Sequence, residues 1–156
     1  MKTAIVFYST HHGNTRRLAE AIQTRCGEVT LFDAARESEI ALDGYDCIGF
    51  ASGIAYGGFY APMLKKMQTC LPPRKKVFFL YTCGSKRPGY TDAAAKTAAE
   101  KECEVLGEYG CLGFDTFGPF KLIGGLAKGH PNAEEIDGAV RFYQELAEQE
   151  NAPKHA

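Results

Sequence analysis

The chain alternates between short apolar runs and stretches in which apolar residues recur with a helical spacing. The apolar runs are rich in β-branched and aromatic side chains, which is typical of buried strands. They are also shorter than most helices in globular proteins. We therefore predict strands at residues 5–8, 28–33, 45–51, 77–81 and 110–117.

Between the strands, the spacing of apolar residues predicts helices with one buried face. Pro62 suits the first turn of one helix, residues 91–106 form another, and Asn132 with Glu135 forms a capping box that starts the last. The predicted buried faces are Leu18, Ala19, Ile22 and Cys26, then Met63, Leu64, Met67 and Leu71, then Ile136, Ala139, Val140, Tyr143 and Leu146.

This alternation predicts a three-layer α/β fold, in which a five-stranded parallel sheet is covered by helices on both faces. The length of 156 residues fits one domain. We expect that domain to span residues 1–150 and to be followed by a loose tail at residues 151–156.

The loop after the first strand has the composition of an anion-binding site. Unpaired N–H groups at the start of a helix point toward one place, where the helix dipole also favours negative charge. The three glycines of a dinucleotide fingerprint are absent, and so is a nucleotide-triphosphate loop. We predict a phosphate site formed by Ser9, Thr10, His11, His12, Gly13, Asn14 and Thr15. The alternative is a capped helix without a ligand.

This loop strongly resembles the first loop of flavodoxins, Ser/Thr-x-Thr-Gly-x-Thr, which holds the phosphate of FMN. His11 and His12 replace its central part and lengthen it by one residue. The resemblance implies the strand order 2-1-3-4-5, with FMN as cofactor. The loops after the first, third and fourth strands are then expected to meet at one site, because ligands bind where strand order reverses.

The loop after the third strand resembles a Ser-Gly-Ile-Tyr-Phe-Gly segment of small flavodoxin-like proteins. In that family this loop covers one face of the flavin, and a flexible peptide at Gly53 or Gly57 would turn a carbonyl toward flavin N5. Tyr56, Phe59 and Tyr60 are candidates for stacking on the ring. The alternative is a surface turn over packed aromatics. The predicted cofactor-binding residues here are Ser52, Gly53, Ile54, Ala55, Tyr56 and Gly57.

The loop after the fourth strand is expected, by the same resemblance, to contact the pyrimidine side of the flavin. Flavodoxins commonly carry acidic residues in this region, whereas this chain has Lys86 and Arg87. We predict that these cations make the fully reduced flavin easier to form. The predicted cofactor-binding residues are Thr82, Cys83, Gly84, Ser85 and Tyr90.

A long apolar connection, residues 118–131, precedes the last helix and is longer than is usual between a strand and a helix. It either forms a lid or docking surface for a redox partner or folds back to seal the sheet edge. Its final Lys-Gly-His-Pro resembles a segment of small flavodoxin-like proteins. We expect His130 to serve as a local cap.

Charge and cysteine content limit the classes of function. A net charge of −1 provides no nucleic-acid footprint, and no apolar run is long enough for a membrane span. The first strand begins too early to leave room for a signal peptide. Six cysteines without a Cys-x-x-Cys pair predict no metal centre and a reduced, cytoplasmic protein.

We expect an FMN-binding electron-transfer protein that exchanges electrons with redox partner proteins, namely a donating reductase and an accepting enzyme. No residue would then be catalytic in the acid–base sense, because the flavin carries the chemistry. The alternatives are an NAD(P)H-dependent FMN quinone or flavin reductase and a binding module without flavin. The absence of a second dinucleotide motif counts against the reductase.

Overall fold

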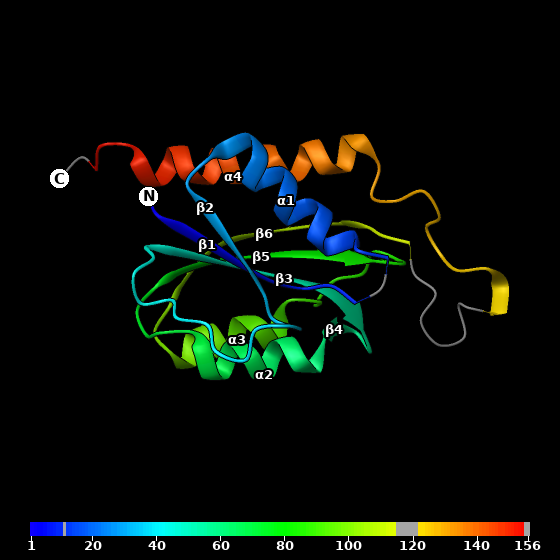
Figure 1. The fold of residues 1–156 in the computed structure, drawn as a ribbon, viewed down its shortest axis with the longest axis horizontal. Coiled ribbons are helices and arrows are strands. Elements are labelled where there is room, and N and C mark those ends of the chain that lie inside the picture. The colour runs from blue at the N-terminus through cyan, green and yellow to red at the C-terminus, as the bar shows by residue number, and fades with distance from the viewer. Residues whose placement is uncertain (11, 115–121, 155–156) are drawn as a thin grey trace.

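The centre of the molecule is a twisted sheet whose main strands are parallel (Figure 1). The computed structural model describes residues 1–10, 12–114 and 122–154. The strands run in the order β2-β1-β3-β5-β6, and the short β4 pairs antiparallel with β3. The strands are β1 (Thr3–Tyr8), β2 (Val29–Asp33), β3 (Cys47–Ala55), β4 (Gly58–Phe59), β5 (Lys76–Cys83) and β6 (Glu104–Leu112).

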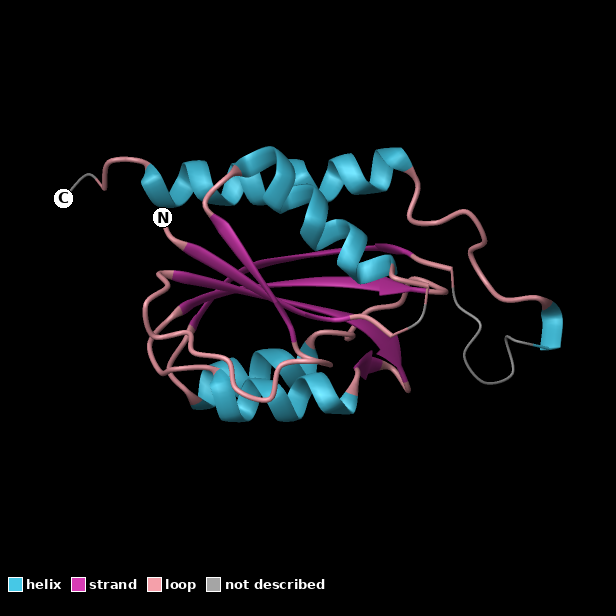
Figure 2. Ribbon diagram, in the orientation of Figure 1, coloured by secondary structure: helices cyan, strands magenta, loops and turns pink. Residues whose placement is uncertain are grey.

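Two layers of helices enclose the sheet (Figure 2). One layer holds α1 (Asn14–Cys26) and α4 (Ala133–Asn151), and the other holds α2 (Ala61–Cys70) and α3 (Asp92–Glu100). The predicted three-layer fold and the order of its five parallel strands are confirmed. Asn151 is the last residue of α4, so the helix extends one residue into the predicted tail.

The prediction was wrong about the chain between α3 and the end of β6. The helix ends at Glu100 instead of residue 106, and β6 begins at Glu104 instead of residue 110. Because β6 is an edge strand, most of its residues are half-buried or exposed, and it lacks the continuous apolar pattern of a central parallel strand. Residues 115–117, the end of the predicted strand, lie outside the described residues.

The loop expected after the third strand also differs from the prediction. The strand β3 continues to Ala55, and the chain turns at Tyr56 and Gly57 into β4. Four of the six residues predicted for this loop, 52–55, are therefore strand residues. The sixth strand arises from this hairpin, whose two-residue turn has positive φ at both positions, 53° and 79°.

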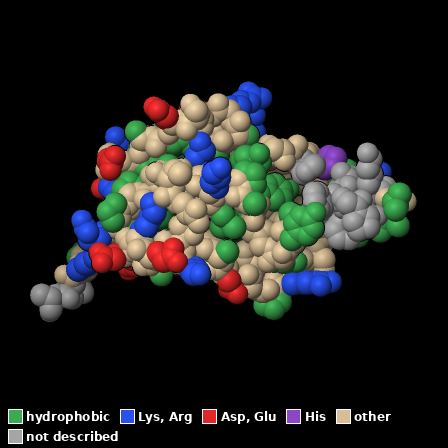
Figure 3. All heavy atoms as spheres, turned by 90° about the horizontal axis from the view of Figure 1, so that it is seen from below, with side chains coloured by type: hydrophobic (Ala, Val, Ile, Leu, Met, Phe, Trp, Pro, Cys, Tyr) green, Lys and Arg blue, Asp and Glu red, His purple; other side chains and the backbone are tan. Residues whose placement is uncertain are grey.

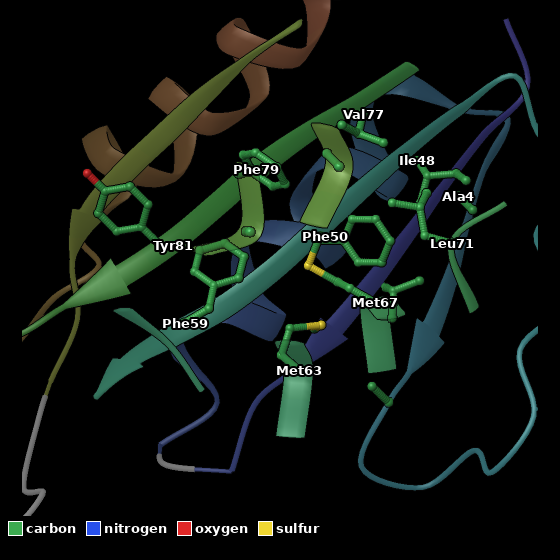
Figure 4. Close-up of a cluster of buried hydrophobic side chains, with 14 of the residues drawn as sticks. Ala4, Ile48, Phe50, Phe59, Met63, Met67, Leu71, Val77, Phe79 and Tyr81 are labelled. Carbon is green, nitrogen blue, oxygen red and sulfur yellow. The ribbon is translucent and has the colours of Figure 1, made fainter. Parts of the chain in front are cut away.

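The core lies in two clusters, one on each face of the sheet. On the face covered by α2 and α3, Phe50 and Phe79 pack against Met63 and Met67 (Figure 4). The opposite face packs against α1 and α4. Its buried residues include Ile5, Leu18, Ile22, Phe78, Leu80, Val140 and Tyr143. Burial on both faces is why the central strands are continuous apolar runs.

The predicted start of α4 is confirmed. Asn132 is the N-cap: its side chain accepts a hydrogen bond from the Glu135 amide, and the Glu135 carboxylate accepts one from the Asn132 amide. This reciprocal pair satisfies two N–H groups that the helix itself leaves unpaired. Within the described ranges, no helix is long and apolar enough to cross a membrane.

Candidate functional site

A polar cleft opens beyond the carboxyl ends of β1, β3 and β5. Its walls come from four separate parts of the chain: the β1–α1 loop, the β3–β4 hairpin, the end of β5 and the residues after β6. It is lined by Tyr8, Ser9, Thr10, Asn14, Thr15, Gly53, Ile54, Tyr60, Thr82, Cys83, Gly84, Gly113 and Phe114. We call this the polar cleft.

The start of α1 forms one wall of the polar cleft. Gly13 precedes the helix in the left-handed conformation, with φ at 66°, and the first helical hydrogen bond runs from the Arg17 amide to the Gly13 carbonyl. The amides before Arg17 have no carbonyl one turn earlier within the helix. Because Asn14 and Thr15 line the cleft, this wall presents N–H groups and the positive end of the helix dipole.

Side-chain hydrogen bonds join this wall to the end of β5 and to the residues after β6. Asn14 Nδ2 donates to the Phe114 carbonyl at 2.8 Å, and the hydroxyls of Thr15 and Thr82 are 2.9 Å apart. Gly113 lies between them: a Cβ there would be 2.8 Å from Asn14 Nδ2 and 2.9 Å from Thr82 Cβ. The start of α1, the end of β5 and the residues after β6 can approach so closely only because residue 113 has no side chain.

The β3–β4 hairpin forms the opposite wall. The buried Ser52 hydroxyl donates to the Gly53 carbonyl at 2.7 Å and accepts from the Tyr60 amide at 3.1 Å. It thereby closes the base of the hairpin. The ring of Tyr60 covers Gly53, where a Cβ would lie 2.4 Å from the Tyr60 hydroxyl, and packs edge-on against Tyr8.

A larger apolar cavity of about 630 Å³ adjoins the polar cleft. The two share Tyr8, Thr10 and Tyr60 in their linings, so they lie side by side. Asp92 is the charged residue of its lining. The remaining walls are Ala55, Tyr56, Gly57, Gly58, Phe59, Ala61, Pro62, Leu64, Gly89 and Ala93. We call this the apolar cavity.

The segment after β6 is held at its end by the start of α4. The Glu135 carboxylate accepts from the Leu112 amide at 3.1 Å and contacts the His130 ring, and the Phe114 amide donates to the His130 carbonyl. Burial opposes ionisation of Glu135, but the hydrogen bonds from Asn132, His130 and Leu112 outweigh it and lower its pKa. His130 therefore helps to fix Phe114, a cleft residue.

The charged groups near the site are exposed. Arg16 pairs with Glu20 one turn along α1 at 2.7 Å, and that hydrogen bond raises the pKa of Arg16. Lys86 and Arg87, in the loop after β5, are both exposed. Figure 3 shows acidic and basic side chains interspersed on the face of α2 and α3, with apolar side chains gathering toward the end that carries the site.

The thiols near the cleft are buried and bonded. Cys83 donates to the Cys111 carbonyl at 3.5 Å, and burial raises the pKa of the Cys111 thiol to about 12. A thiol so far from its thiolate form is a poor nucleophile. None of the six cysteines forms a disulfide, and the described residues contain no cluster of three metal-binding side chains.

Comparison with known proteins identifies the family. The profile described as "Flavodoxin domain" matches residues 5–112, more than half of the chain. The chain belongs to the flavodoxin domain family. Over 148 residues it is also 32% identical to the uncharacterized protein MJ0298 of Methanocaldococcus jannaschii, covering 94% of this chain and 98% of that protein.

Solved flavodoxins share the fold. A flavodoxin from the domain Archaea superimposes with a TM-score of 0.68 at 20% identity, covering 94% of this chain and 97% of that one. The Fusobacterium nucleatum flavodoxin bound to flavin mononucleotide superimposes with a TM-score of 0.62 at 15% identity, covering 93% and 98%. At these identities the likeness concerns the fold alone.

In this flavodoxin domain, most of the residues predicted to form the site are brought together. Half of the eighteen line the polar cleft: Ser9, Thr10, Asn14, Thr15, Gly53, Ile54, Thr82, Cys83 and Gly84. Ala55, Tyr56 and Gly57 line the apolar cavity. Gly13 is the N-cap that precedes α1, and Ser52 closes the hairpin instead of facing the cleft. His11 lies outside the described residues.

The other predicted residues have different surroundings. The exposed His12 packs its ring on Phe114, with centroids 4.4 Å apart. Tyr90 is buried in the core, where it contacts Tyr81 edge-on and donates to the Ser85 carbonyl at 2.6 Å. Neither Tyr90 nor Ser85 lines the polar cleft or the apolar cavity.

The sequence prediction missed Tyr8, Gly113 and Phe114. Tyr8 ends the first predicted strand, so its place at the carboxyl edge of the sheet was available as a signal. Gly113 and Phe114 were assigned to the middle of a predicted strand, because the start of β6 was placed six residues too late. That error moved the end of the strand beyond the residues that line the cleft.

Proposed function

We propose that this protein binds FMN and transfers electrons as a flavodoxin. The observation that carries the proposal is the junction of the polar cleft, at the start of α1, with the apolar cavity. FMN has the matching form, a phosphate joined through a polar chain to a flat, largely apolar ring system. When bound, FMN supplies the one- and two-electron chemistry.

The polar cleft suits the phosphate. The first turn of α1 offers backbone N–H groups and a favourable dipole, and Ser9, Thr10 and Thr15 add hydroxyl donors. The side-chain ties of Asn14 and Thr15 hold this turn in place before the ligand arrives. Such preorganisation increases affinity because little freedom remains to be lost on binding.

The apolar cavity suits the ring system. Its volume lies within the range of about 300–1,000 Å³ typical of small-molecule sites. Tyr8, Tyr56 and Tyr60 offer aromatic surface, and the turn at Gly57 brings the backbone close to the ligand without a side chain between them. The fold shared with an FMN-bound flavodoxin supports this arrangement.

Electrons would pass to and from partner proteins, a donating reductase and an accepting enzyme. Leu122 and Ile123 are 89% and 71% exposed in the segment after β6, beyond the carboxyl ends of the strands (Figure 1). Their exposure favours a docking role over sealing of the sheet edge. Six cysteines without a disulfide fit a reduced compartment such as the cytoplasm. Residues 1–150 would form the single functional domain.

The test is a titration of purified apoprotein with FMN, followed by absorbance spectra during stepwise reduction. We expect a saturable 1:1 complex whose flavin is reduced by NAD(P)H only when a reductase is added. Rapid reduction by NAD(P)H alone would establish the alternative, a quinone or flavin reductase. Protein that stays colourless with excess FMN would refute flavin binding.

A further inference from the structure

Thr82 lies next to the proposed phosphate site, in contact with one of its donors. Its hydroxyl oxygen is 2.9 Å from that of Thr15, and the two residues are only 4% and 2% exposed. Thr82 is on β5 and Thr15 on α1, and both line the polar cleft. Two hydroxyls in contact share one hydrogen bond, so one of them donates and the other accepts.

We propose that Thr82 is a positioning residue for phosphate recognition, which donates to Thr15 and so directs the Thr15 proton into the polar cleft. This inference rests on the proposed binding of FMN. A phosphate dianion only accepts hydrogen bonds, so its presence in the cleft selects this direction of the pair. A hydroxyl that accepts one bond also becomes a stronger donor, because the two bonds polarise each other in a buried site.

The surroundings hold Thr82 in the required position. Its backbone lies within the sheet, in register with Gly53 on β3 and Cys111 on β6. Gly113 packs against its Cβ, and Asn14 ties the start of α1 to the carbonyl of Phe114. The sheet therefore holds the donor, Thr82, in place. Thr15, the residue that it orients, is on α1, whose first turn contacts the phosphate in the proposed complex.

The test compares FMN with riboflavin, which lacks the phosphate. Thr82→Val removes the hydroxyl but keeps the branched shape, and we expect it to weaken FMN binding about tenfold while riboflavin affinity changes less than about twofold. Thr82→Ser, which keeps the hydroxyl, should stay within about threefold of the wild type for FMN. Fluorescence titration measures both ligands, and thermal unfolding checks each variant.

A double-mutant cycle shows whether Thr82 acts through Thr15. Thr82→Val should add almost nothing once Thr15→Val is present, since the group that it orients is gone. Full additivity, an unchanged FMN affinity in Thr82→Val, or an equal loss for FMN and riboflavin would each overturn the inference. If Thr82→Val does not fold, Thr82→Ala replaces it throughout. Wild-type protein without FMN affinity would instead refute the proposed function, and this inference with it.

Discussion

The two walls of the site are held in opposite ways. The wall at the start of α1 is hydrogen-bonded to β5 through Thr15 and to the residues after β6 through Asn14, and these elements pack closely at Gly113. The hairpin wall is anchored at its base by Ser52 and by the buried Phe59, whereas Tyr56 at its tip is 95% exposed. We infer that the first wall provides rigid anion recognition and that the second can adjust around the ring.

The largest effect should come from filling the space at Gly113. Gly113→Ala places a methyl group within 3 Å of Asn14 and Thr82, so we expect the free energy of unfolding to fall by about 2 kcal/mol and FMN affinity to fall more than tenfold. At the hairpin, Gly57→Ala has open space and meets only the cost of a positive φ, about 1 kcal/mol. Urea denaturation and FMN titration measure both. Equal stability losses at the two sites would contradict the difference between the walls.

Removing the amide of Asn14 tests the tie itself. Asn14→Ala should lower the free energy of unfolding by about 1 kcal/mol and lower FMN affinity about fivefold, because the start of α1 loses its hydrogen bond to the Phe114 carbonyl. Asn132→Ala is the matched control: it removes the cap of α4, also costing about 1 kcal/mol, but leaves FMN affinity unchanged. Similar losses of FMN affinity in both variants would point to global destabilisation.

Charge reversal in the loop after β5 tests electrostatic tuning. Lys86→Glu with Arg87→Glu should make the potential for full reduction of FMN more negative, on the order of 50 mV, because negative charge disfavours the reduced, anionic flavin. The shift should shrink at high salt, since both side chains are exposed. Potentiometry of the two proteins checks this. A shift toward positive potential would reject the predicted role of these cations.

The exposed pair after β6 should affect delivery of electrons and not the cofactor. Leu122→Ser with Ile123→Ser removes apolar surface from a segment outside both the polar cleft and the apolar cavity. We expect electron transfer to a partner to slow about threefold, with FMN affinity unchanged. Stopped-flow kinetics with a flavodoxin reductase measures the rate. Unchanged transfer would argue against docking through these residues.

The smallest effect should follow deletion of residues 152–156, beyond the last turn of α4. Ala152 to Lys154 are exposed, so their loss should change the free energy of unfolding by less than about 0.5 kcal/mol. FMN affinity should be unaffected. A larger destabilisation, measured by urea denaturation, would show that the functional domain extends past the predicted boundary.

Local signals in the sequence predicted a large part of this protein correctly. The buried strands, the Gly13 turn into α1 and the capping box of Asn132 and Glu135 each depend on residues only a few positions apart. The spacing of apolar residues gave a wrong prediction for β6, because the burial of this strand changes along its length. Its more exposed first half was mistaken for the end of a helix. The spacing also could not reveal β4, a strand of two residues.

The sequence by itself determined the layers of the fold and the loop at which the site begins, because apolar spacing and helix-start signals act over short distances. Only the tertiary structure decided what each polar side chain does there. Thr15 meets a hydroxyl 67 positions away, and Asn14 meets a carbonyl 100 positions away. Tyr90, predicted for the site, is buried in the core instead. Such pairings depend on how the sheet is ordered and on how closely its elements pack, which no local pattern encodes.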